Sequence, residues 1–264
     1  MLQKRVNLFG LFIDDVSMDE AVNEAENALD KNGGQMVFFT PNLKILNGAR
    51  QSAAVRKILN SASISLPDGI GLRVVAFLVG APLKNTVPGI DFGENLLGLA
   101  EKTSSRVFLL GAKDGIAQKA AHNLKMKIPN LNICGAHHGY FTDDEIDSIC
   151  DKINESGAQI LIVCRGFPKQ EKFVLLAKNK LPNIKIFACL GGSLDVWSGK
   201  VKRAPTLVQE MHLEWLWRIL LEPERAERLF LSLPTIASAF RIFLNKNRII
   251  IPSRAYNQTD TLGR

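Results

Sequence analysis

The residues that build disulfide scaffolds, zinc sites and aromatic binding platforms are scarce in this chain of 264 residues. It has four cysteines, and no two of them form a Cys-x-x-Cys pair. Three of them lie in or beside apolar segments, a pattern that argues against a disulfide framework or a zinc site and favours the reducing cytosol. Only two tyrosines and three tryptophans are present, which is few for a protein that stacks nucleic-acid bases on aromatic rings. Nucleic acid is therefore not expected as a partner.

Long apolar runs are also absent. No window reaches the roughly 18–20 uninterrupted apolar residues of a membrane-spanning helix, which excludes a polytopic membrane protein. The N-terminus, MLQKRVNLFG, has too short an apolar stretch for the core of a signal peptide, so export is not expected. With 46% hydrophobic and 22% charged residues, the composition is that of a water-soluble globular protein of one large or two small domains.

The net charge of +7 is concentrated toward the end of the chain. Residues 196–264 hold 11 Lys and Arg against 6 Asp and Glu. Such a basic segment is typical of proteins with an anionic partner (nucleic acid, phosphate or an acidic membrane surface), and equally of a soluble flexible end. Within it, residues 229–244 read LFLSLPTIASAFRIFL with a single charge. This stretch is too short to cross a bilayer and suits either a segment lying at a membrane surface or an ordinary packed helix pair.

Residues 1–195 alternate between short apolar runs and amphipathic helical patterns. Nearly continuous apolar runs are typical of parallel strands covered on both faces, so the alternation predicts an α/β fold, with a Rossmann-like, mostly parallel sheet flanked by helices. A capping box at Ser17 and Glu20 marks the first helix. After residue 195 the pattern becomes helical, with one long helix expected from Pro205 to Leu221 and Pro223 placed where a second would begin. The chain thus divides into an α/β catalytic domain (1–195) and a basic helical appendage (196–264). The runs expected as strands are 6–9, 36–40, 63–66, 107–110, 131–134, 160–164 and 184–189.

Ligands of parallel sheets bind beyond the carboxyl ends of the strands, so the loops there are candidate sites. Asp68, in a Pro-Asp-Gly turn, is either a helix-capping or turn residue, or a general base that takes a proton from an attacking hydroxyl. The Gly191-Gly192 turn is a candidate amide cradle for phosphate, with Asp195 placed to accept hydrogen bonds from a base or ribose. The segment from Gly111 to Gly115 lacks the middle glycine of a Gly-x-Gly-x-x-Gly fingerprint and is a weak nucleotide-binding signal.

Two further constellations have a functional and a structural interpretation. His137 and His138 suggest a metal site, but adjacent side chains on an extended segment point to opposite faces, and the chain has no Asp-x-Asp pair. No metal is therefore expected. Arg218, Arg225 and Arg228 are spaced to share one face of a continuous helix, either as a diphosphate clamp or as an ordinary surface paired with neighbouring glutamates.

These loops occur in an order that closely resembles the WecG/TagA/CpsF family of bacterial glycosyltransferases, over roughly residues 5–230. Members of that family move a sugar from a UDP-sugar to a polyprenyl-diphosphate-linked sugar during synthesis of cell-surface polysaccharide or teichoic acid. The matching segments are TPN at 40–42, PDGIG at 67–71, GID at 89–91, VFLLGAKDGIAQKAA at 107–121, HHGYF at 137–141, GFPKQEKF at 166–173, GGSLDVWSGKVKRAP at 191–205 and HLEWLWRILLEPERAER at 212–228.

The resemblance implies a role for each matched residue. Asp68 would be the base that activates the acceptor hydroxyl for an inverting, direct displacement. The other residues implied are Thr40, Asn42 and Gln170 in the pocket beside it, Gly111, Gly191, Gly192 and Asp195 around the uridine diphosphate, and Arg218, Arg225 and Arg228 at the acceptor diphosphate. Arg165 stands where small or apolar residues are common in the family, which would favour an anionic donor sugar.

The partners implied are a UDP-sugar donor, a polyprenyl-diphosphate-linked acceptor and an anionic membrane surface, with the protein peripheral on the cytoplasmic face of the cell membrane. The expected donor sugar is N-acetylmannosamine or its uronic acid, with UDP-glucose as an alternative, and no cofactor is expected. The sequence does not decide whether the protein forms a homo-oligomer. Two rivals outside the family are a nucleotide-dependent oxidoreductase, which should show a full glycine fingerprint, and a nucleic-acid-binding module.

Overall fold

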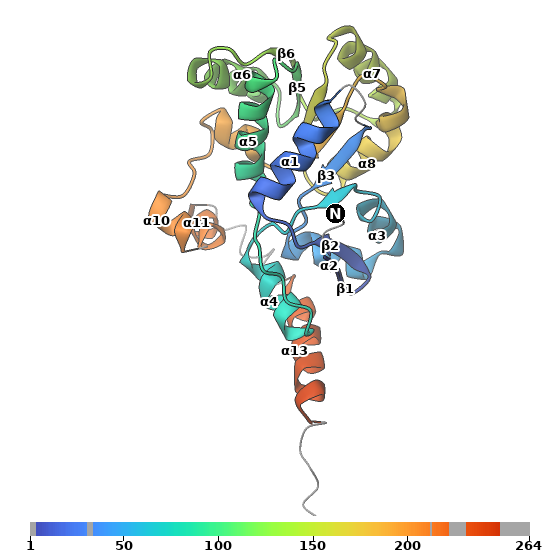
Figure 1. The fold of residues 1–264 in the computed structure, drawn as a ribbon, viewed down its shortest axis with the longest axis vertical. Helices are drawn as coiled ribbons and strands as arrows, with labels where there is room; N and C mark the ends of the chain where they lie inside the picture. Colours follow the sequence, from blue (N-terminus) through green and yellow to red (C-terminus); the bar gives the residue numbers. More distant parts are fainter. Residues whose placement is uncertain (1–3, 31–33, 212, 222–230, 249–264) are drawn as a thin grey trace, which may run out of the picture.

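The structure, a computed structural model, describes residues 4–30, 34–211, 213–221 and 231–248 (Figure 1). Its body is a six-stranded, all-parallel sheet in the order β4–β3–β8–β7–β5–β6, which confirms the predicted α/β class. Strands β5, β7 and β8 are buried at every position, and this burial on both faces explains their continuous apolar sequences. The strands are β3 (Met36–Phe39), β4 (Ile64–Ser65), β5 (Val107–Gly111), β6 (Ile133–His137), β7 (Ile160–Cys164) and β8 (Ile186–Cys189).

The first expected strand lies outside this sheet. It corresponds to β1 (Arg5–Leu8), which pairs antiparallel with β2 (Leu11–Asp14), a strand that the sequence analysis missed. Phe9 and Gly10 form the turn with positive φ at both residues, as a type I′ turn requires, but Phe-Gly lacks the usual Asn-Gly signal. Asp14 fixes the ribbon to the sheet, since its carboxylate pairs with Arg5 at 2.8 Å and accepts the Ser65 N–H at 2.8 Å.

Helices cover both faces of the sheet and enclose one apolar core on each. Phe38 and Phe39 show the division. Phe38 packs against Phe92 of the first group of helices given below (ring centroids 4.9 Å apart, planes tilted by 36°), while Phe39 belongs to the core on the side of the second group. The first group is α1 (Met18–Leu29), α5 (Gly89–Lys102), α6 (Ile116–Lys127) and α9 (Ser193–Trp197); the second is α2 (Leu43–Gln51), α3 (Ala53–Leu59), α4 (Ile70–Leu78), α7 (Ile146–Glu155) and α8 (Lys169–Ala177).

The capping box predicted for the first helix is present in α1. The Glu20 N–H donates to the Ser17 hydroxyl at 3.2 Å, and the Ser17 N–H donates to the Glu20 carboxylate at 2.8 Å. These two bonds satisfy amides that the first turn of a helix leaves unpaired.

The helical region after α9 differs from the prediction in one respect. The single helix expected from Pro205 to Leu221 is wrong, because α10 (Thr206–Glu210) and α11 (Glu214–Leu221) are separate. The Leu213 N–H donates to the Val208 carbonyl, five residues back, at 2.9 Å, which departs from the four-residue spacing of an α-helix. The position expected to open a further helix, Pro223, lies outside the described residues.

The last described helix, α13 (Leu233–Arg248), lies beside α4 and projects with it away from the sheet (Figure 1). Its first turns contact α2, where the Thr235 hydroxyl donates to the Asn47 side chain at 2.9 Å and the Arg50 guanidinium donates to the Pro234 carbonyl at 3.0 Å. None of the helices in the described part of the chain is both long and apolar enough to cross a membrane.

Candidate functional site

Six loops leave the carboxyl ends of the parallel strands. Because β4, β3 and β8 are neighbours in the sheet, the loops that follow them, which begin after Ser65, Phe39 and Cys189, meet at one edge although they are distant in sequence. Binding sites of open parallel sheets form at this edge.

Asp68 lies in the loop after β4 and is half-buried. Its N–H donates to the Pro41 carbonyl at 3.1 Å, and the Leu66 N–H donates to the Phe39 carbonyl at 2.8 Å. These backbone hydrogen bonds hold the Pro-Asp-Gly turn against the turn after β3, and neither of them involves the Asp68 side chain. The N-cap of α4 is Gly69, so Asp68 is not the residue that caps this helix.

Thr40 and Asn42 in the neighbouring turn both have defined structural contacts. Thr40 is buried, and its hydroxyl donates to the Cys189 carbonyl at 2.9 Å, which joins the ends of β3 and β8. Asn42 is the N-cap of α2, where its side-chain oxygen accepts the Ile45 N–H at 3.2 Å. Both residues therefore lie in the turn whose Pro41 carbonyl accepts the Asp68 N–H, and each has a structural contact at the end of a strand or the start of a helix.

Gln170 connects the loop after β7 to the loop after β8. It is 1% exposed, and its side-chain oxygen accepts the Gly191 N–H at 3.2 Å. Its amide nitrogen donates to the Glu171 carboxylate at 2.9 Å. Gln170 thus fixes the position of the Gly191-Gly192 turn from within the protein.

Glu171 is a residue that the sequence analysis quoted in its loop but did not assign. It is 1% exposed, one carboxylate oxygen accepts from Gln170, and the other is buried and has no hydrogen-bond partner in the part of the chain that the structure describes. Burial raises the pKa of this carboxyl group above its ordinary value. In the sequence, Glu171 is distinguished only by its position next to Gln170 near the start of a helix. That position does not indicate that its carboxylate is buried.

The Gly191-Gly192 turn is open to approach. Gly191 has φ +59°, and a Cβ placed on either glycine would meet no atom of the described residues within 4 Å. Asp195 follows in the first turn of α9 and pairs with the Lys200 ammonium at 3.0 Å. The backbone here can come close to a ligand, which is the property that a phosphate cradle needs.

Gly111, which was predicted to bind the uridine diphosphate, is buried against neighbouring backbone rather than open to a ligand. It is buried with φ +151°, and a Cβ would lie 2.4 Å from the Cys164 carbonyl oxygen. The Gly139 backbone also lies against it, since a Cβ on Gly139 would be 2.9 Å from the Gly111 Cα. Glycine is therefore required here for the close packing of β5, β7 and the loop after β6.

The two adjacent histidines do not point to opposite faces, so that expectation is wrong. Their ring centroids are 4.3 Å apart, because β6 ends at His137 and the alternation of side chains ends with it. In the part of the chain that the structure describes, no three His, Cys, Asp or Glu side chains gather as a metal site requires.

Arg165 supports the loop after β6 rather than an open pocket. Its guanidinium donates to the Gly139 and Phe141 carbonyls, each at 2.8 Å, and lies 3.6 Å from the centroid of the Phe141 ring. These contacts account for the arginine within the fold and give no support to a role in selecting an anionic donor sugar.

The structure describes only one of the three arginines predicted to bind the acceptor diphosphate. Arg218 belongs to α11, whereas Arg225 and Arg228 lie outside the described residues, so their grouping stays a prediction. Arg203, which the sequence analysis did not single out, connects this region to the body. It pairs with Asp91, with Glu94 at 3.5 Å and with Glu214 at 3.6 Å, and thereby joins α5 to α11.

Comparison with known proteins gives a consistent result. The sequence profile of the Glycosyl transferase WecG/TagA/CpsF family matches residues 6–248. A Bacillus spizizenii protein named N-acetylglucosaminyldiphosphoundecaprenol N-acetyl-beta-D-mannosaminyltransferase is 36% identical over 80% of both chains. Proteins of the same name from Bacillus subtilis and Staphylococcus aureus are 34% and 30% identical, over 76% and 85% of this chain and 77% and 88% of their own. The chain therefore belongs to the WecG/TagA/CpsF family of glycosyltransferases.

Proposed function

We propose that this glycosyltransferase moves N-acetylmannosamine from a UDP-linked donor to the N-acetylglucosamine of a polyprenyl-diphosphate-linked acceptor, with inversion at the transferred sugar. The names of the relatives support the sugar and the acceptor. The observation that carries the proposal is the meeting of the Asp68 turn, the Thr40 turn and the open Gly191-Gly192 turn at the ends of three adjoining strands.

In this proposal Asp68 is the general base. Its carboxylate accepts the proton of the acceptor hydroxyl as that oxygen forms a bond to the anomeric carbon of the donor sugar. The bond from the anomeric carbon to the diphosphate breaks in the same step, and UDP leaves with the electron pair. One displacement on one face of the sugar inverts its configuration, and no covalent intermediate with the protein forms.

The departing diphosphate carries the developing negative charge, and in this proposal it lies against the open backbone of the Gly191-Gly192 turn, with the Gly192 N–H as donor. The Gly191 N–H donates to Gln170, which fixes the turn from the inside, so the turn does not have to be organised during the reaction. Asp195 would hold the uridine, and Arg218, Arg225 and Arg228 the acceptor diphosphate. We propose transfer without a bound metal ion, so that EDTA should leave the rate unchanged.

Membrane contact belongs to the same proposal. Phe240 and Leu244 lie four residues apart on α13, are 49% and 46% exposed, and are followed along the chain by basic residues. An apolar helix face with neighbouring basic residues suits docking on an anionic lipid surface, where the acceptor resides. The protein would then act at the cytoplasmic face of the membrane.

The test is incubation of the protein with a panel of UDP-sugars and a lipid-diphosphate-N-acetylglucosamine acceptor, with mass spectrometry of the product. We expect the acceptor mass to rise by one N-acetylhexosamine with UDP-N-acetylmannosamine and by nothing with UDP-glucose. Transfer of another sugar would correct the donor. The absence of transfer with every donor, together with absorbance from a bound nicotinamide or flavin, would refute the proposal in favour of an oxidoreductase.

A further inference from the structure

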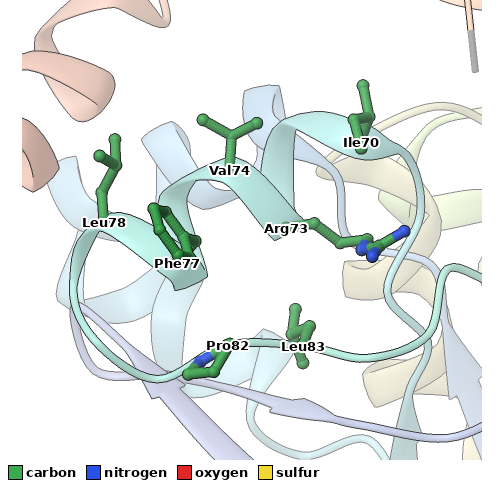
Figure 2. Close-up of a pocket in the computed structure, with 7 residues that line it drawn as sticks. All are labelled: Ile70, Arg73, Val74, Phe77, Leu78, Pro82 and Leu83. Carbon is green, nitrogen blue, oxygen red and sulfur yellow. The ribbon is translucent and has the colours of Figure 1, made fainter.

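An apolar groove runs along α4. Figure 2 shows the residues that line it, which are Ile70, Arg73, Val74, Phe77 and Leu78 on the helix and Pro82 and Leu83 on the returning segment. Its volume is about 350 Å³, within the range of pockets that hold small organic ligands. Val74 and Phe77 line the groove and are 44% and 61% exposed, so an apolar ligand would remove their side chains from water.

The groove starts at the candidate active site. Ile70, at one end, is separated from Asp68 only by Gly69, and a Cβ on Gly69 would meet no atom within 4 Å. At the other end the apolar surface continues onto α13, since the Phe77 ring lies 6.2 Å from that of Phe243. The groove therefore leads from the proposed base to the apolar helix face that we propose contacts lipid.

Arg73 is the one charged side chain among the residues that line the groove. In Figure 2 its guanidinium lies at the Ile70 end. Within the part of the chain that the structure describes, Arg73 forms no ion pair with a carboxylate. A guanidinium in this state is a good partner for diphosphate oxygens, with which it pairs in two parallel hydrogen bonds.

We propose that this groove binds the first isoprene units of the acceptor's polyprenyl chain, with Arg73 facing the diphosphate. The inference rests on the proposed function. The order of groups along the protein (the Asp68 carboxylate, the Arg73 cation, the apolar groove) matches the order of groups along the acceptor (sugar hydroxyl, diphosphate, isoprenoid). A UDP-sugar has no apolar segment to fill the groove, so the acceptor is the substrate that fits it.

The experiment compares two soluble acceptors in the absence of vesicles, so that membrane docking does not contribute. One is farnesyl-diphosphate-N-acetylglucosamine, and the other carries a methyl group in place of farnesyl. We expect the wild type to prefer the farnesyl acceptor in kcat/KM. Val74→Asp, which places a carboxylate on an exposed position of the groove, should lower kcat/KM for the farnesyl acceptor about tenfold more than for the methyl acceptor.

Leu175→Asp is the matched control, because Leu175 on α8 is 50% exposed and lies outside the groove. It should keep the wild-type preference. Arg73→Gln should raise KM for both acceptors by a similar factor, since both carry the diphosphate. The groove proposal is overturned if the wild type shows no chain preference, or if Val74→Asp and Leu175→Asp keep it equally. If the wild type transfers to neither acceptor, the proposed function itself fails.

Discussion

Asp68 is held by its backbone in a turn that does not depend on its side chain for a helix cap. Asp68→Asn should therefore fold as the wild type does, because asparagine has the same shape and the two backbone hydrogen bonds of the turn remain. Loss of the proton acceptor should lower kcat by about 10²-fold or more. Thermal unfolding and steady-state kinetics on the same preparation check both parts. A well-folded variant with near-normal kcat would remove Asp68 from the mechanism.

The buried carboxyl group of Glu171 should make the stability of the protein depend on pH. Burial raises its pKa in the folded protein above the ordinary value of 4.5, so folding favours the protonated carboxyl group. The wild type should lose stability as the pH rises from about 4.5 to the raised pKa, because over that range the carboxyl group ionises in the unfolded chain but stays protonated in the folded protein. Glu171→Gln keeps an oxygen acceptor for Gln170 and has no charge to bury.

The melting temperatures of the two proteins should therefore converge at low pH and separate at high pH, with Glu171→Gln the more stable. The difference between the two curves isolates this residue from other titrating groups. A constant difference across the pH range would show that Glu171 has the same pKa in the folded and unfolded states, which would contradict the raised pKa.

The sequence identifies which residues are candidates for the site and which loops hold them, but not the contacts that they make. The polar residues after apolar strands marked Thr40, Asp68 and Gln170. The hydrogen bond from Thr40 to Cys189 and the one from Gly191 to Gln170 join segments 149 and 21 residues apart, and depend on a strand order that the sequence does not specify. For the same reason the sequence does not place the Arg165 side chain, which donates hydrogen bonds to the loop after β6.

At the scale of elements, two glycines in loops of similar appearance differ in what surrounds them. Gly111→Ala would place a Cβ 2.4 Å from the Cys164 carbonyl oxygen, at φ +151°. We expect it to lower the free energy of unfolding by about 3 kcal/mol or more, because strain at a rare φ adds to a backbone clash between β5 and β7.

Gly192→Ala is the matched control, since Gly192 has φ −96° and open space at its Cβ position. Its free energy of unfolding should stay within about 0.5 kcal/mol of the wild type in urea denaturation. Equal destabilisation by the two substitutions would contradict the distinction between a packing glycine in β5 and an accessible glycine in the turn after β8.

The elements themselves were mostly predictable because burial on both faces leaves a continuous apolar run, as in β5, β7 and β8. The exceptions have local causes. Strand β2 follows a Phe-Gly turn without the usual hairpin signal. The break between α10 and α11 depends on a hydrogen bond from Leu213 to Val208, and no glycine or proline marks it in the sequence.

At the scale of the whole molecule, the division into a catalytic domain (1–195) and an appendage (196–264) stays a prediction, but α13 has contacts that bear on how to test it. Thr235 and Ala239 are fully buried, and Arg50 of α2 donates to Pro234. Deleting the C-terminal segment would expose α2 and α4, so a truncated protein would confuse loss of stability with loss of membrane binding. Substitutions on the exposed face of α13 separate the two.

The double variant Phe240→Ser, Leu244→Ser removes two exposed apolar side chains from one face of α13 and should leave the melting temperature within a few degrees of the wild type. It should abolish flotation with vesicles of anionic lipid, because apolar burial is lost and basic residues alone contribute only about 1 kcal/mol each near the surface. Leu175→Ser, Leu176→Ser on α8 is the control, since both side chains are also exposed, and it should float like the wild type. For the wild type, flotation should weaken with neutral lipid and with added salt, as expected where charge contributes. Equal flotation of both double variants would assign the exposed face of α13 a role other than membrane contact.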